Sequence, residues 1–266
     1  MPFALIGFTF GVVYEQRPFE VGTLVSVILC MVFARNAAMA FNRYIDAHYD
    51  ALNPRTAVRE IPAGVIKPQQ ALLFTILNCV AFVVTTWFIN RSCFYLSPVA
   101  LAVILVYSYT KRFTALCHLV LGIGLSLAPL GAYLAVTGYF SLVPILFSCV
   151  VFTWVAGFDI LYALQDEDFD RAQKLHSIPA WLGRRKAMMV SVMLHVVTAL
   201  LLLAIGAIAM LGLWYWLGAA LFIGLLVYQH TLVKPHDISK VNMAFATTNG
   251  IASVVFAGFV ILSLLL

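Results

Sequence analysis

The sequence predicts an all-α polytopic membrane protein, a bundle of about nine transmembrane helices with cytoplasmic cap segments. Of its 266 residues, 63% are apolar and only 10% are charged, and the mean hydropathy is +0.99, far above that of an ordinary soluble domain. The apolar residues also form long solid runs, whereas the strands of a β-barrel would alternate in polarity. No soluble appendage is apparent, so residues 1–266 are expected to form a single domain.

Polar breaks separate the expected spans. The first span, of about 14 residues, would give roughly 21 Å of helix, which is shorter than the roughly 30 Å hydrocarbon core. Met1 and Pro2 are not followed by the basic region or cleavage site of a signal peptide, so we expect this helix to be truncated at its N-terminus. The expected spans are residues 1–14, 21–41, 71–90, 93–110, 115–137, 140–160, 187–208, 210–230 and 241–265.

Lys and Arg concentrate in alternate loops. The loops after the first, third, fifth and seventh spans hold only Arg17 and Arg91. By the positive-inside rule the basic loops are cytoplasmic, so the N-terminus lies inside and the C-terminus outside, as expected for a bacterial inner membrane protein. This topology also explains the net charge of +5, so no nucleic acid is expected, and no protein partner is predicted. The basic loops contain Arg43, Arg55, Arg59, Lys67, Lys111, Arg112, Arg171, Lys174, Arg184, Arg185, Lys186, Lys234 and Lys240.

Two polar islands, residues 41–64 and residues 158–183, interrupt the apolar runs. The first contains Asn42, Asp46 and Asp50, which we call the first acidic stripe. Residues four apart lie on one face of a helix. Carboxylates at that spacing repel one another, and beside a bilayer they also lose water. A cation is therefore expected among them, and the hard, oxygen-binding Mg²⁺ is the candidate.

A second acidic stripe consists of Asp159, Tyr162, Asp166 and Asp170. Intervals of three, four and four residues predict one helical face again. Each stripe is followed by an Ile-Pro-Ala sequence, and an even number of spans separates the two stripes. The pattern indicates an internal duplication that places two acidic helices opposite each other on one side of the membrane.

Two facing acidic stripes suit an anionic substrate that metal ions bridge to the protein, above all a diphosphate. A single loop acid can simply be a solvated charge, but paired stripes on one face favour a site. Basic side chains must then bind the outer phosphate oxygens. The candidates are Arg43, Arg55, Arg59, Lys111, Arg112 and Lys174.

These motifs resemble those of a known family. The first acidic stripe, followed by Asn53-Pro54-Arg55-Thr56 and Arg59-x-x-Pro62-x-Gly64, resembles the first signature of the UbiA superfamily of intramembrane aromatic prenyltransferases. The second acidic stripe resembles its second signature, and Tyr107 to Arg112 is similar to its turn after the fourth helix. The resemblance covers essentially the whole chain and is strongest to the bacterial 4-hydroxybenzoate polyprenyltransferase-like group.

The resemblance implies a nine-helix bundle with a central cavity. It also implies Mg²⁺-dependent transfer of a polyprenyl group from polyprenyl diphosphate to a small aromatic acid, in ubiquinone- or menaquinone-type quinone biosynthesis. The first choice of acceptor is 4-hydroxybenzoate, prenylated ortho to its hydroxyl, and a dihydroxynaphthoate is the alternative. The implied metal ligands are Asn42, Asp46, Asp50, Asp159, Asp166 and Asp170, and the implied catalytic residues are Asp46, Asp50, Asp166, Asp170 and Tyr162.

Three further features leave alternatives open. Tyr162 could orient a phosphate or shield a cation with its ring, or be an ordinary interfacial aromatic. Arg35 lies inside a span, seven residues before Asn42, and we expect it to face the bundle interior and meet the carboxylate of the aromatic acid or an acidic partner. Asn242 and Asn249, seven apart in the last span, could face the cavity, but hydrogen bonding between helices is preferred. A transporter is the hypothesis from another class, because it too would carry intramembrane charges and repeats.

Overall fold

The computed structural model describes residues 2–266, and for residues 245–247 it describes the backbone alone. This part of the chain is helical throughout and forms no strand; Lys234 and Asp237 make an isolated β-bridge. The long helices are α1 (Pro2–Val13), α2 (Val21–Leu52), α3 (Pro68–Trp87), α4 (Arg91–Thr110), α5 (Cys117–Thr137), α6 (Leu142–Ala163), α9 (Arg184–Ile208), α10 (Leu213–Leu232) and α11 (Asn249–Leu265). The short elements are the 3₁₀ turn η1 (Leu164–Asp166), α7 (Glu167–Ala172), α8 (Ile178–Leu182) and the π-helical turn η2 (Met243–Thr248).

Length and composition make this a multi-pass membrane protein. Within the described chain, seven helical segments are long and apolar enough to cross a bilayer: α2, α3, α4, α5, the stretch Leu142–Ala172, α9 and α10. In a bilayer the backbone has no water to bond, so a spanning segment satisfies its own polar groups by forming a helix. The remaining long helices, α1 with 12 residues and α11 with 17, are apolar but shorter. The expected count of about nine spans therefore depends on these two.

The first acidic stripe is helical, as predicted. Helix α2 does not end with the apolar run at residue 41 but continues to Leu52, which gives it a total length of 32 residues. At 1.5 Å per residue this is about 48 Å, longer than the roughly 30 Å hydrocarbon core. The extra turns carry Asn42, Asp46 and Asp50 beyond the apolar part of the helix.

The second acidic stripe was predicted as one continuous helical face, and this is wrong in its second half. Helix α6 ends at Ala163, the chain tightens into η1, and α7 follows. A 3₁₀ turn has three residues per turn instead of 3.6, so the residues beyond it leave the original face. Asp170 lies beyond this turn and is 0% exposed.

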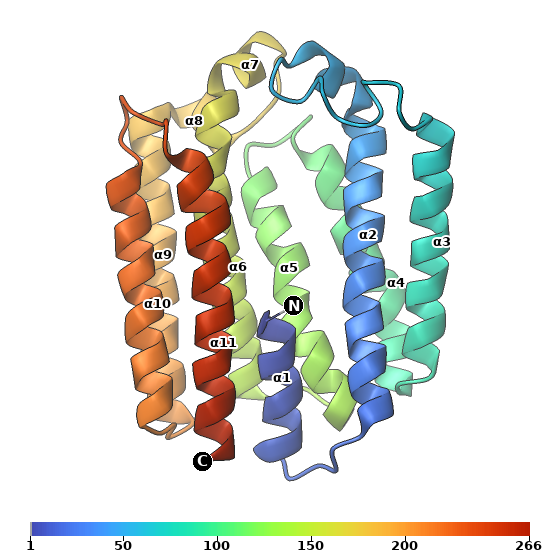
Figure 1. The fold of residues 1–266 in the computed structure, drawn as a ribbon, viewed down its shortest axis with the longest axis vertical. Helices are drawn as coiled ribbons and strands as arrows, with labels where there is room; N and C mark the ends of the chain where they lie inside the picture. The colour runs from blue at the N-terminus through green and yellow to red at the C-terminus, as the bar shows by residue number, and fades with distance from the viewer. Residues whose placement is uncertain (1) are drawn as a thin grey trace.

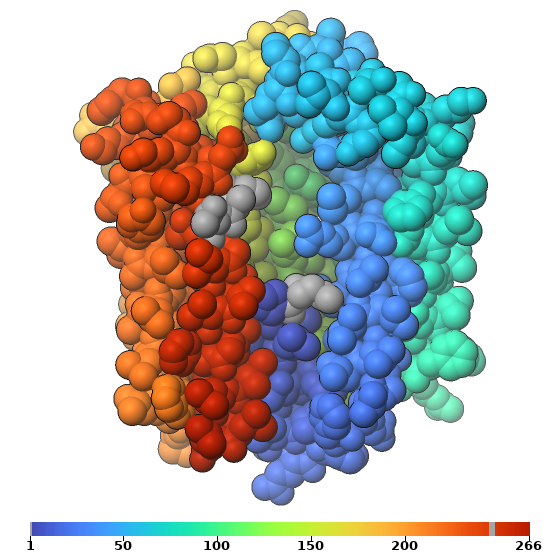
Figure 2. Space-filling model, in the orientation of Figure 1, coloured from blue at the N-terminus to red at the C-terminus, as the bar shows by residue number. Residues whose placement is uncertain are grey.

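The helices follow one another around the bundle. Figure 1 shows α2, α3 and α4 on one side, α9, α10 and α11 on the other, and α5 and α6 between them at the back. Helix α1 packs against α5 and α11. The connection from α2 to α3 lies at the same end as α7 and α8 (Figure 1). Figure 2 shows the surface hollowed between α2 and α11, with α5 visible in its depth.

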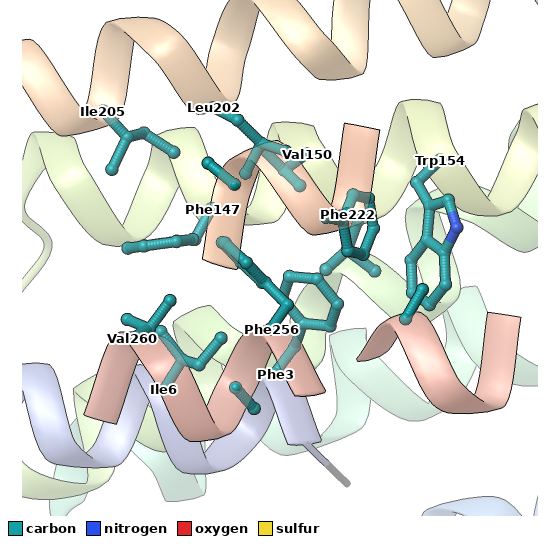
Figure 3. Packing of buried hydrophobic residues seen from close by; sticks show 14 of the residues in the cluster. Phe3, Ile6, Phe147, Val150, Trp154, Leu202, Ile205, Phe222, Phe256 and Val260 are labelled. Carbon is teal, nitrogen blue, oxygen red and sulfur yellow. The ribbon is translucent and has the colours of Figure 1, made fainter. Parts of the chain in front are cut away.

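A hydrophobic cluster joins α1, α6, α9, α10 and α11 (Figure 3). Phe3, Trp154, Phe222 and Phe256 pack their rings together, with Phe3 and Trp154 centroids 5.3 Å apart. In lipid such contacts stabilise mainly through van der Waals packing. The Trp154 Nε1 donates to Asn249 Oδ1 at 3.1 Å, which is the interhelical hydrogen bond expected for Asn249. The cluster fixes α6, the helix that carries Asp159.

Candidate active site

The first acidic stripe and all of the second except Asp170 line one cavity of about 170 Å³. The first comes from the last turns of α2, and the second from the end of α6 and η1. The predicted opposition of the two stripes is therefore confirmed. The polar lining residues are Asn42, Asp46, Tyr49, Asp50, Asn53, Arg55, Thr56, Arg59, Tyr107, Ser108, Lys111, Arg112, Cys117, His118, Asp159, Tyr162 and Asp166.

On the α2 side, each carboxylate already faces an arginine. Asn42 Nδ2 donates to Asp46 Oδ2 at 2.9 Å, and the Arg112 Nη2 lies 3.7 Å from Asp46 Oδ1. Arg59 Nη1 donates to both oxygens of Asp50, at 2.7 and 2.8 Å. These contacts offset the like-charge repulsion between carboxylates four residues apart.

On the opposite side, Asp166 binds the loop that follows α2. Arg55 donates from Nε at 3.0 Å and from Nη2 at 2.6 Å, and Asn53 Nδ2 donates at 3.1 Å. Arg55 Nη1 also donates to the Tyr162 hydroxyl at 3.1 Å. Burial lowers the pKa of Arg55, but the hydrogen bond and charge of Asp166 outweigh it, and the net shift is upward. The two polar islands are thus bound to each other across the cavity.

Two further acids of the second acidic stripe pair with Lys111, just after α4, and with His118, at the start of α5. His118 Nδ1 lies 2.6 Å from Asp159 Oδ2, and Lys111 Nζ lies 2.7 Å from Asp170 Oδ1. Burial lowers the pKa of Lys111, but the charge of Asp170 acts in the opposite direction, and the net shift of the pKa is upward. The ammonium therefore stays protonated at neutral pH. Asp170 is not among the cavity-lining residues.

The cavity suits a hard cation together with an anion. Asn42, Asp46, Asp50, Asp159 and Asp166 supply amide and carboxylate oxygens, the ligands that Mg²⁺ prefers. The described residues contain no preformed group of three His, Cys, Asp or Glu ligands. Mg²⁺ often keeps several waters and binds one or two carboxylates plus substrate phosphates, so the donor set fits a metal that arrives with a diphosphate.

Four predicted site residues lie outside the cavity lining: Asp170, Arg43, Lys174 and Arg35. Arg43 lies 3.5 Å from Glu60, and Lys174 is exposed with a φ of 53°. Arg35, expected to face the bundle interior, is exposed on α2 and makes no ion pair with a described residue. The functional roles assigned to all the predicted site residues, these four included, remain predictions.

Sequence reasoning missed His118. It showed no metal-binding spacing with other histidines, and its partner Asp159 lies 41 residues away. It also assigned no role to Asn53, although the residue stands in the first motif. Only the packing of α5 against α6 and of one polar island against the other reveals these contacts.

The fold and the cavity together define a class: polytopic helical membrane proteins with a carboxylate- and cation-lined cavity at one end. The chain matches the UbiA prenyltransferase family over residues 1–260 and belongs to that family. It is an enzyme of the prenyltransferase type. Family membership therefore favours the enzyme hypothesis over the transporter.

Curated relatives align over most of the chain. The 4-hydroxybenzoate octaprenyltransferase of Aeromonas salmonicida is 32% identical over 243 residues, covering 91% of this chain and 83% of that protein. The enzyme of the same name from Tolumonas auensis is 31% identical over 227 residues, covering 85% and 79%.

Solved structures share the fold. The apo structure of a UbiA homologue from Aeropyrum pernix K1 has a TM-score of 0.88 at 29% identity, covering 98% of this chain and 96% of that one. A UbiA homologue from Archaeoglobus fulgidus, bound to GPP and Mg²⁺, has a TM-score of 0.74 at 19% identity, covering 100% and 96%. At 19% identity, the similarity to the Archaeoglobus fulgidus homologue shows a shared fold alone.

Proposed function

We propose that this prenyltransferase moves a polyprenyl group from polyprenyl diphosphate to an aromatic acid in a Mg²⁺-dependent reaction of quinone biosynthesis. The observation that carries the proposal is one cavity lined by carboxylates of both acidic stripes and by four cationic side chains. The names of the curated relatives support 4-hydroxybenzoate as the first choice of acceptor, with a dihydroxynaphthoate as the alternative. The ligands named for the archaeal neighbour support a prenyl diphosphate and Mg²⁺.

The two acidic stripes would hold the metal. Asn42, Asp46 and Asp50 approach from α2, and Asp159 and Asp166 approach from the other side. Mg²⁺, when bound, neutralises the charge that develops on the diphosphate leaving group. Asp170 is retained as a sixth proposed ligand, although its carboxylate faces Lys111 and is buried.

The four cavity cations would change partners when the substrate binds. Arg55, Arg59, Lys111 and Arg112 each lie against a carboxylate. A carboxylate that binds a metal cannot keep the same contact with a cation, and the freed guanidinium or ammonium then finds phosphate oxygens nearby. Metal and diphosphate should therefore bind together more tightly than either binds alone. Arg43 and Lys174 are proposed to act at the outer edge of the diphosphate site.

The reaction breaks the bond between the first prenyl carbon and the diphosphate oxygen, and the diphosphate keeps the electron pair. The ring carbon ortho to the phenol hydroxyl attacks the allylic cation, and its proton passes to a carboxylate or phosphate oxygen, which restores aromaticity. Tyr162 lines the cavity, and its ring is proposed to shield the cation. Water must be kept away from that cation, which a bilayer-embedded bundle achieves.

The remaining assignments complete the proposal. Arg35 is proposed to bind the carboxylate of the aromatic acid, since it is exposed on the same helix as the first acidic stripe. The whole chain is proposed to act as one domain in the bacterial inner membrane, with its N-terminus and the cavity opening on the cytoplasmic side. The distribution of Lys and Arg supports this orientation.

The test uses the purified chain in lipid nanodiscs with a polyprenyl diphosphate and either 4-hydroxybenzoate or a dihydroxynaphthoate. Product is identified by mass spectrometry with Mg²⁺ or with EDTA. The proposal predicts a prenylated aromatic acid that requires Mg²⁺ and that is lost in Asp46→Asn. The matched control Asp168→Asn, whose side chain is 87% exposed, should retain activity. Absence of product from both acceptors in a folded chain would contradict the acceptor assignment.

A further inference from the structure

His118, at the start of α5, is contacted at both ring nitrogens. Its side chain is only 3% exposed. Nδ1 lies 2.6 Å from Asp159 Oδ2 on α6, and Nε2 accepts from the backbone N–H of Ile178, at the start of α8, at 3.3 Å. One side chain therefore connects a cavity carboxylate to the segment that follows α7.

The contacts fix the tautomer of His118. A backbone N–H can only donate, so Nε2 must be the unprotonated nitrogen. The ring proton then resides on Nδ1 and is donated to Asp159. Both nitrogens are thereby engaged, which leaves His118 no lone pair with which to remove a proton from the substrate. Asp159 accepts this hydrogen bond on Oδ2 and lines the cavity.

Other contacts join the same two segments. The backbone N–H of His176 donates to Lys111 O at 2.7 Å, and Cys117 Sγ donates to His176 O at 3.5 Å. Lys111 Nζ lies 2.7 Å from Asp170 Oδ1. Residues 111–118 are thus attached to residues 170–178 at several points, and His118 is the contact that also reaches a cavity carboxylate.

We propose that His118 is a positioning residue that orients Asp159 toward the metal–diphosphate site and ties that carboxylate to the Ser177–Ile178 segment. The inference rests on the proposed function, because it assigns the orientation of a proposed metal ligand. Hydrogen bonds to a ligand from outside the metal site typically change metal affinity or activity by about 10–100-fold. A buried histidine that merely fills space would affect stability and leave the metal response unchanged.

Two substitutions separate the two contacts. The amide nitrogen of asparagine is as many bonds from Cα as Nδ1, so His118→Asn can still donate to Asp159 while losing the contact to Ile178. The amide oxygen of glutamine matches Nε2, so His118→Gln can still accept from Ile178 while losing Asp159. His118→Phe removes both contacts and keeps an aromatic ring. His230→Gln is the matched control, since His230 contacts His195 away from the cavity.

The experiment measures thermal stabilisation of each purified variant as Mg²⁺ is titrated with geranyl diphosphate, together with hydrogen exchange of residues 175–183. We expect His118→Gln and His118→Phe to raise the Mg²⁺ concentration for half-maximal stabilisation by about 10–100-fold, and His118→Asn to stay close to the parent. Exchange at residues 175–183 should rise in the Asn and Phe variants and not in the Gln variant. His230→Gln should change neither quantity.

The outcomes distinguish the two proposals. If the parent chain itself shows no stabilisation by Mg²⁺ with geranyl diphosphate, the proposed function fails and this inference fails with it. If the parent responds and His118→Phe has the same half-maximal Mg²⁺ concentration, only the role of His118 is overturned. An equal loss in the Asn and Gln variants would also overturn it, because a structural defect does not discriminate between the two ring nitrogens.

Discussion

At the scale of single residues, the cavity balances carboxylates against cations from distant parts of the sequence. The spacing of Asp46 and Asp50 predicts that a cation must lie among them, and the structure supplies Arg112 and Arg59. Asp166 accepts a hydrogen bond from Arg55, which lies 111 residues earlier in the sequence. The unfavourable charge density of each stripe is thus offset within the protein, and ligand binding has to compete with these pairs.

The Arg59–Asp50 pair gives the first prediction. Arg59→Gln leaves the Asp50 carboxylate, 8% exposed, without its cation, so we expect a destabilisation of about 1–3 kcal/mol. Mg²⁺ with geranyl diphosphate should recover part of this loss, since the metal replaces the missing charge. Arg43→Gln breaks an exposed pair with Glu60 and should cost about 0–1 kcal/mol. Thermal melting measures both variants, and equal melting temperatures would contradict the argument.

Tyr162 gives the second prediction. Tyr162→Phe loses the hydroxyl that Arg55 donates to but keeps the ring, whereas Tyr162→Leu loses both. If the ring shields the allylic cation, the difference in kcat between the two variants should correspond to about 0.5–2 kcal/mol, or roughly 2–30-fold. Equal kcat values would mean that the ring contributes nothing beyond its volume.

The residue scale also shows the limit of prediction from sequence. Periodicity identifies Asn42, Asp46 and Asp50 because all of them lie on one helix. It cannot identify the pair of His118 and Asp159, whose members come from different helices and share no pattern in the sequence.

At the scale of elements, the two polar islands differ in ways that their similar sequences do not suggest. The intervals from Asp159 to Asp170 are compatible with one continuous helix, yet η1 interrupts it. Ser177 caps α8 by accepting from Ala180 N at 3.3 Å, with Pro179 in its first turn. The corresponding Ile61-Pro62-Ala63 lies among turns. Local propensity permits both outcomes, so tertiary contacts decide between them.

The close approach of α5 and α6 gives the third prediction. A Cβ at Gly122 would lie 2.6 Å from the backbone oxygen of Phe152, whereas one at Gly124 on the same helix would have its nearest neighbour at 3.9 Å. Gly122→Ala should therefore destabilise the protein by about 1–3 kcal/mol. It should also reduce activity, because α5 carries His118 and α6 carries Asp159. Gly124→Ala is the matched control and should lower neither the melting temperature nor kcat; an equal loss in both would contradict the packing argument.

At the scale of the whole molecule, the sequence predicts the architecture well because the bilayer leaves few choices. Each of the nine expected apolar runs corresponds to a long helix of the described chain. Most ends differ by three residues or fewer, whereas α11 begins at Asn249, eight residues after the expected start. The largest difference is the extension of α2 to Leu52, where polar residues continue a helix that hydropathy alone ends at residue 41. Hydropathy reports contact with lipid, so it cannot detect the part of a helix that leaves the membrane.

The orientation in the membrane gives the fourth prediction. Lys174 lies in the chain between α7 and α8, and Phe140 lies at the opposite end, between α5 and α6; both are exposed. If the basic loops are cytoplasmic, a membrane-impermeant maleimide applied to intact cells should label Phe140→Cys and not Lys174→Cys. Permeabilised cells should label both, and the unmodified chain gives the background. The reverse pattern would contradict the orientation.

The central claim is that the two acidic stripes act together on one metal–diphosphate group. The most direct measurement is the rate of prenylated acid formation, by mass spectrometry, in Asp46→Asn, Asp166→Asn and the double variant, each with saturating Mg²⁺. Residues that act as one unit are strongly non-additive, so the double variant should be hardly slower than the slower single variant. Two losses that multiply, or a single variant with the activity of the parent chain, would contradict the shared site.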